Sequence, residues 1–153
     1  MDQTTALPGT IEMSDDPRVL RTKSQDFNWF SPVLKAQLEH KSADTVYFPA
    51  DRHELRDIVR HAFLHKRPIV VRGGGTGNYG QCVPLAGGCV IDMARLDGIL
   101  EVTDTSVTAE AGIRIDRLQA RLHDDGRELR LYPSSLRMSS LGGFLGGGAG
   151  GVG

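Results

Sequence analysis

The stretch that decides the fold is Arg72-Gly73-Gly74-Gly75-Thr76-Gly77-Asn78-Tyr79-Gly80, which directly follows the apolar run 68–71. Glycines have no Cβ, so successive backbone N–H groups can turn to one side and form an anion-binding nest. Four of the residues 73–77 are glycine, which is more than a tight turn requires. We therefore interpret 72–80 as a loop that binds phosphate through its backbone. We expect Gly75→Val or Gly77→Val to weaken phosphate binding by this loop more than Arg72→Ala does.

Residues 75–80 also match the G-x-G-x-x-G pattern of a Rossmann loop. A Rossmann loop opens a helix whose N-terminus faces the pyrophosphate. Here Pro84 and the pair Gly87-Gly88 follow closely, and they prevent a helix of useful length. The Gly-Lys-Ser/Thr ending of a P-loop is absent as well. We therefore reject the P-loop, and a Rossmann-type NAD(P) reductase is the less favoured alternative.

The segments around the loop predict an α+β fold with a mixed sheet. Strands are expected at 45–48, 68–71, 89–92 and 129–131, and a hairpin at 99–102 and 106–111. Helices are expected at 32–40, 52–65 and 114–124. The helix 52–65 should begin after the N-cap Asp51 and bury one apolar face, made of Leu55, Ile58, Val59, Ala62 and Phe63. We interpret 68–71 as a buried strand, with a right-handed crossover from 45–48 if the two are parallel.

The two ends of the chain differ from the middle. Residues 1–30 are polar and without period, so we interpret 1–41 as an extended arm followed by a short helix. The domain proper is expected over 42–153. Beyond 133 we expect a Ser/Gly loop, but its apolar residues make it unsuitable as a flexible linker: Leu141, Phe144, Leu145 and Val152. We expect these side chains to need partners beyond residue 153, and the domain to be truncated at its C-terminus with the substrate domain absent.

Composition excludes several classes of function. The chain is 39 % hydrophobic and 24 % charged with a net charge of −1, so it has no electrostatic reason to bind nucleic acid. It shows neither a signal peptide nor an apolar run of about 20 residues, and we expect a cytoplasmic protein without a membrane span. Cys82 and Cys89 form no disulfide framework, and His61 with His65 lacks a third ligand. No metal site is predicted.

A second glycine-rich cluster, 133–151, adds four serine hydroxyls to bare backbone. The two clusters are joined by a stretch that includes Met93-Ala94-Arg95-Leu96-Asp97-Gly98-Ile99. In this order the three segments resemble the FAD-binding domain of the vanillyl-alcohol oxidase / p-cresol methylhydroxylase (PCMH) type. The resemblance extends from about residue 42 to the end of the chain. Glycolate oxidase subunits and D-lactate dehydrogenases carry this domain.

The resemblance implies two α/β subdomains with FAD between them and the first loop around the diphosphate. The cofactor-binding residues that it implies in the first loop are Gly73, Gly74, Gly75, Thr76, Gly77, Asn78 and Gly80. Those that it implies in the second cluster are Pro133, Ser134, Ser139, Ser140, Gly142 and Gly143. Thr76 stands where relatives with covalent flavin often carry histidine, so FAD is expected to be non-covalent at Thr76. Phe144, Gly147 and Gly148 stand where many relatives have polar side chains.

The function that the resemblance implies is that of an FAD-linked oxidase or dehydrogenase, acting on a 2-hydroxy acid or another CH–OH donor. Its partners would be a small-molecule substrate and an electron acceptor or partner subunit. Catalytic residues are expected beyond residue 153, and the fragment alone should be inactive. The alternative is a non-catalytic nucleotide-binding accessory subunit. The substrate, the acceptor and the oligomeric state do not follow from the sequence.

Overall fold

Strand β4 (Cys89–Asp92) is an inner strand of the main sheet, and all four of its residues are buried. The computed structural model describes residue 7 and residues 9–152 of the chain. The sheet has the order β1 (Met13–Ser14), β2 (Thr45–Tyr47), β4 and β3 (Ile69–Arg72). Strands β2 and β3 are parallel to β4, and β1 is antiparallel to β2. The glycine loop leaves the end of β3, and no helix lies between β3 and β4, which agrees with the rejection of a Rossmann loop.

Helix α3 (Arg52–Leu64) connects β2 to β3. The Asp51 carboxylate accepts hydrogen bonds from the N–H groups of His53 and Glu54, at 2.7 and 2.9 Å, as the N-cap prediction requires. The apolar face of α3 is narrower than predicted, because Val59 and Phe63 are 42 % and 79 % exposed. The prediction of a buried strand at 68–71 is also wrong: β3 is an edge strand, and its alternate residues Ile69 and Val71 are exposed, so one face of the strand is uncovered.

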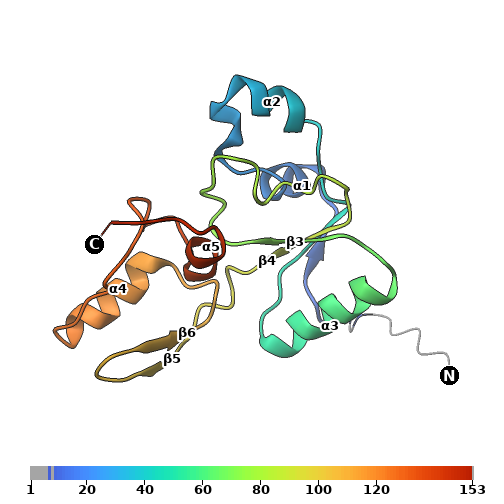
Figure 1. Ribbon diagram of the computed structural model, residues 1–153. Helices are drawn as coiled ribbons and strands as arrows, with labels where there is room; N and C mark the ends of the chain where they lie inside the picture. Colours follow the sequence, from blue (N-terminus) through green and yellow to red (C-terminus); the bar gives the residue numbers. More distant parts are fainter. Residues whose placement is uncertain (1–6, 8, 153) are drawn as a thin grey trace.

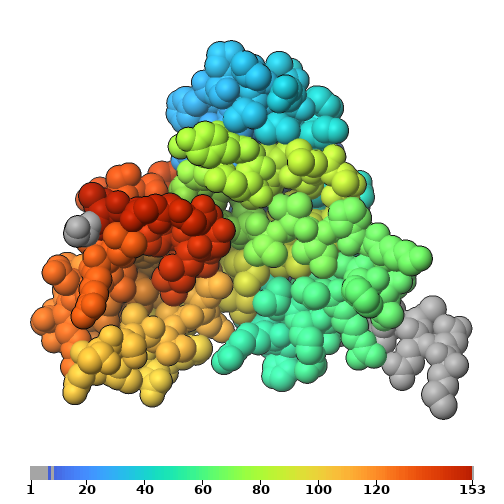
Figure 2. All heavy atoms as spheres, in the orientation of Figure 1, coloured from blue at the N-terminus to red at the C-terminus, as the bar shows by residue number. Residues whose placement is uncertain are grey.

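The N-terminal segment is folded over residues 13–38, and the predicted extended arm is therefore wrong within the described residues. It contains β1, α1 (Pro17–Lys23), the 3₁₀ helix η1 (Phe27–Phe30) and α2 (Pro32–Leu38). Asp16, Asp26 and Ser31 cap the three helices through their side chains. In Figure 2 this blue segment lies against the yellow-green residues that follow the glycine loop. Residues 1–6, on which part of the arm prediction falls, lie outside the described residues.

A second, smaller unit follows β4 (Figure 1). Strands β5 (Ile99–Val102) and β6 (Val107–Ala109) form the predicted antiparallel hairpin. Helix α4 (Ile115–Asp124) buries Leu118 and Leu122 in a cluster that includes apolar residues of the hairpin. Two α/β units result, and the fold class expected from the resemblance is confirmed. None of the helices in the described part of the chain is long and apolar enough to cross a membrane.

The C-terminal cluster corrects three expectations. No strand forms at 129–131; instead Tyr132 makes an isolated bridge with Val152. The predicted Ser/Gly loop contains helix α5 (Leu141–Gly146), whose N-cap Ser140 accepts a hydrogen bond from the Gly143 N–H at 3.2 Å. Phe144 is buried and Leu141 packs against the α4 cluster, so both have partners within this chain. Of the four apolar side chains, only Leu145 and Val152 are exposed.

Candidate cofactor-binding site

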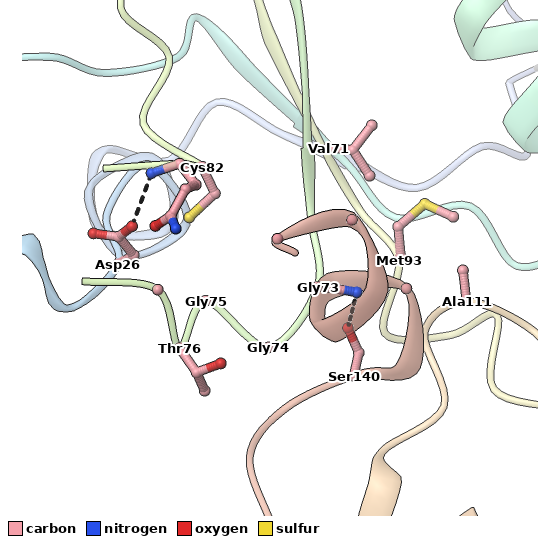
Figure 3. A pocket seen from close by; sticks show the side chains of 16 residues that line it. Asp26, Val71, Gly73, Gly74, Gly75, Thr76, Cys82, Met93, Ala111 and Ser140 are labelled. Carbon is pink, nitrogen blue, oxygen red and sulfur yellow. Dashed lines mark hydrogen bonds between the residues drawn. The ribbon is translucent and has the colours of Figure 1, made fainter. Parts of the chain in front are cut away.

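The glycine loop at the end of β3 meets α5 of the second unit, and a cavity of about 470 Å³ lies where they meet (Figure 3). Eight predicted residues line it: Gly73, Gly74, Gly75, Thr76, Gly77, Ser140, Gly142 and Gly143. The other predicted residues do not reach the cavity wall: Asn78, Gly80, Pro133, Ser134 and Ser139. The structure thus brings together two clusters that are distant in the sequence, as Thr76 and Ser139 illustrate with a separation of 63 residues.

The main property of the first loop is a run of free donors. The backbone N–H groups of residues 74–78 donate to no other group in the described chain. Gly75, Thr76 and Gly77 are half-buried, where N–H groups normally find an acceptor, and successive free N–H groups form a site for an anion. Residues 74–77 line the cavity and Asn78 follows directly after them, so residues 74–78 form a cradle that suits a phosphate group. Neither lysine nor arginine lines the cavity beside it.

The glycines of the first loop are needed for two different reasons. Gly75 and Gly80 have φ values of +65° and +78°, a region that residues with a Cβ rarely adopt. Gly73 and Gly74 instead allow the second cluster to approach. A Cβ at Gly73 would overlap the Ser140 hydroxyl, and one at Gly74 would overlap the Met138 carbonyl oxygen. These two glycines are therefore required by loop packing as well as by access to a ligand.

Serine hydroxyls connect the second cluster to the first loop. The Thr76 Oγ1 lies 2.9 Å from the Ser139 Oγ, which in turn lies 2.7 Å from the Ser135 Oγ. Ser139 is buried and does not line the cavity, so its hydroxyl orients the Thr76 side chain from outside the cavity. Ser140 is also buried and caps α5, which brings the glycines of that helix to the cavity.

Arg72 does not line the cavity, and its guanidinium binds the N-terminal segment. Its Nη1 donates to the Lys23 carbonyl oxygen at 3.3 Å, to the Gln25 carbonyl oxygen, and to the Cys82 Sγ at 3.2 Å. The guanidinium also fills the space that a Cβ at Gly75 would need. Burial raises the pKa of the Cys82 thiol, although Arg72 opposes this shift. Arg72 therefore links the start of the loop to the N-terminal segment, and anion binding is left to the backbone N–H groups.

Several residues of the cavity wall were not predicted: Asp26, Val71, Gln81, Cys82, Met93, Ala111, Gly146 and Gly147. Asp26 is the most informative of them because it is charged, only 4 % exposed, and far from the loop in sequence. Its carboxylate accepts hydrogen bonds from the N–H groups of Asn28 at 2.8 Å and Gln81 at 3.0 Å. The one sequence signal for Asp26 is that of a helix N-cap, which says nothing about a ligand site.

Two α/β units, a cavity between them and a glycine-rich cradle of free N–H groups define a domain that binds a phosphate-containing cofactor. The family described as "FAD binding domain" matches residues 43–153, and the chain belongs to this family. An FAD-linked oxidoreductase of Mycobacterium tuberculosis is 33 % identical over 106 residues, 68 % of this chain and 23 % of the relative. Glycolate oxidase subunit GlcD of Bacillus subtilis is 31 % identical over 112 residues, 71 % of this chain and 24 % of GlcD.

Solved structures agree on the fold. A structure of alkyldihydroxyacetonephosphate synthase superimposes with a TM-score of 0.78 at 24 % identity, over 91 % of this chain and 29 % of that one. Cholesterol oxidase from Brevibacterium sterolicum superimposes with a TM-score of 0.68 at 20 % identity, over 92 % of this chain and 25 % of that one. The chain thus spans about a quarter of the length of the proteins it resembles.

Proposed function

We propose that the complete protein is an FAD-dependent oxidoreductase and that this chain is its FAD-binding portion. The observation that carries the proposal is the cradle of free N–H groups at residues 74–78 beside the cavity. Relatives named as an FAD-linked oxidoreductase, a glycolate oxidase subunit and a D-2-hydroxyglutarate dehydrogenase support it.

In this proposal the N–H groups of residues 74–78 hold the FAD diphosphate, because they supply donors without a Cβ in the way. Gly142 and Gly143 provide a smooth wall along the cofactor, and Ser140 holds the helix that carries them. FAD, when bound, accepts a hydride equivalent from substrate and passes the electrons on. The chain supplies binding and orientation, and the remaining part of the protein would bind the substrate and the electron acceptor.

The first prediction concerns how the flavin is held. The Thr76 hydroxyl is engaged with Ser139 and offers no ring nitrogen for a covalent bond. We expect the purified complete protein to be yellow and to release its flavin into the supernatant on acid precipitation. Absorbance of pellet and supernatant measures this directly. Flavin that stays with the precipitated protein would show a covalent bond and would contradict non-covalent binding.

The second prediction concerns the substrate class. We expect a 2-hydroxy acid to bleach the visible absorbance of the protein-bound flavin under anaerobic conditions, with glycolate and D-2-hydroxyglutarate as the first compounds to test. A second candidate function comes from the synthase of Dictyostelium discoideum, alkyldihydroxyacetonephosphate synthase, whose alignment covers 91 % of this chain. Flavin that stays oxidised with both compounds would contradict the 2-hydroxy acid prediction and would leave the synthase function as the candidate.

A further inference from the structure

The segment Lys23–Phe27 connects α1 to η1 and lies outside the region 43–153 that matches the FAD-binding family. It nevertheless contributes Asp26 to the wall of the cavity (Figure 3). Burial of the Asp26 carboxylate is costly unless hydrogen bonds compensate for the lost hydration. The contacts of this segment with the glycine loop explain the burial.

Three sets of hydrogen bonds tie this segment to the loop, one at each end and one in the middle. At the start of the loop, Arg72 donates to the carbonyl oxygens of Lys23 and Gln25. In the middle, the Phe27 N–H donates to the Gly77 carbonyl oxygen at 2.7 Å. After the loop, the Gln81 N–H donates to Asp26 Oδ2 at 3.0 Å.

The segment is also anchored to the central strand by an ion pair. Lys23 Nζ lies 2.7 Å from the carboxylate of Asp92, whose side chain is 2 % exposed. Asp92 ends β4 and pairs in register with Arg72 of β3. Because a buried carboxylate without its partner is costly, this ion pair fixes Lys23 at the same end of the sheet from which the loop departs.

These contacts determine the direction of loop peptides. In a trans peptide the carbonyl group and the following N–H point in opposite directions. Since the Gly77 carbonyl points to Phe27, the Asn78 N–H points away from the N-terminal segment. Asp26 fixes the Gln81 peptide in the same manner through its N–H. The segment thus engages the Gly77 carbonyl and the Gln81 N–H, on the two sides of residues 78–80, and occupies none of the free N–H groups of residues 74–78.

We propose that Asp26 is a positioning residue of the FAD site, which holds the glycine loop in the conformation that presents its free N–H groups. The proposal rests on the FAD binding proposed above. Both carboxylate oxygens are used, one by Asn28 and one by Gln81. The competing explanation is that Asp26 merely caps η1 through its bond to the Asn28 N–H.

A matched set of variants separates the two explanations in the complete protein. Asp26→Asn keeps a good N-cap residue but leaves only one acceptor oxygen for two N–H groups. Asp26→Ala removes both acceptors. Asp16→Ala is the control, since Asp16 caps α1 in the same way, through the N–H groups of Arg18 and Val19, and does not contact the loop.

The measurement is FAD titration of the deflavinated protein, followed by flavin fluorescence, with the visible circular dichroism of bound flavin and a thermal melt of the apoprotein. We expect both Asp26 variants to raise the Kd for FAD by about tenfold or more, the size expected for a lost hydrogen bond to a charged group. The dichroism should change as well. Asp16→Ala should leave the Kd unchanged, and the Asp26→Asn apoprotein should melt within a few degrees of this control.

An unchanged Kd in Asp26→Asn would overturn the positioning role. A loss of the cooperative melt in Asp26→Asn would overturn it too, because the proposal assigns the carboxylate to the loop and not to the core. Failure of the wild-type protein to bind FAD would instead overturn the proposed function. The two failures are therefore distinguishable.

Discussion

Gly74→Val should eliminate FAD from the complete protein. A Cβ at Gly74 would overlap the Met138 carbonyl oxygen and approach the Ser139 Cα to 3.2 Å, and both are backbone atoms that cannot rotate aside. Overpacking of this kind costs about 1–3 kcal/mol, which corresponds to roughly 5- to 150-fold in affinity. The displaced loop would also lose its aligned N–H groups, so we expect the upper end of that range or beyond. The flavin-to-protein ratio after purification measures it.

Gly150→Val is the matched control for Gly74→Val. It introduces the same side chain into the second glycine cluster, at a position where a Cβ meets nothing within 4 Å. We expect this variant to keep a normal flavin-to-protein ratio. Equal flavin content in the two variants would show that the close approach of the two clusters does not matter for the cofactor.

Arg72→Ala should both destabilise the protein and remove the flavin. The guanidinium joins the start of the loop to Lys23, Gln25 and Cys82, and its loss leaves two carbonyl oxygens without their donor. Hydrogen bonds to a charged group are worth about 1.5–3 kcal/mol, so the free energy of unfolding should fall by about 3 kcal/mol. Denaturant unfolding of the apoprotein and the flavin-to-protein ratio together measure this result.

The exposed Arg130 provides the control, since Arg130→Ala removes the same charge at a surface position. An Arg72→Ala protein that unfolds like wild type and keeps its flavin would contradict the structural role of Arg72. This prediction departs from the expectation drawn from sequence, which gave Arg72→Ala the smaller effect. That expectation considered only phosphate contacts, which it assigned to the backbone N–H groups, whereas the Arg72 guanidinium binds carbonyl groups of the N-terminal segment.

Sequence patterns predicted the elements that have strong periodicity and clear boundaries. The central strand Cys89–Asp92 begins with three consecutive apolar residues, and Ile115, Leu118 and Leu122 have helical spacing. Helices α1, η1 and α5 were not predicted, because four to seven residues show no clear period. The equally short α2 was predicted only because Ser31 and Pro32 are a strong helix-start signal. Half of the residues of α5 are glycine, and such a composition opposes helix formation unless caps and packing supply the stability.

The candidate site was predictable in its backbone and not in its side chains. Clustered glycines mark bare backbone wherever it occurs, and eight of the predicted residues do line the cavity. Asp26 and Cys82 reach the cavity wall through contacts that join distant segments, such as the bond between Asp26 and Gln81 across 55 residues. No local pattern encodes such a pairing. Glycine at 73 and 74 was predicted because a phosphate must approach the backbone. The structure adds a second reason, which is that Ser140 and Met138 of the second cluster leave no room for a Cβ at these two positions.

The most direct test of the central claim is a crystal structure of the complete protein with FAD bound. The distances to measure are those between the diphosphate oxygens and the backbone nitrogens of residues 74–78. We expect several of them to fall in the hydrogen-bond range of about 2.7–3.2 Å, with Arg72 still directed at Lys23 and Gln25. A diphosphate held by lysine or arginine side chains, with these N–H groups facing solvent, would contradict the account.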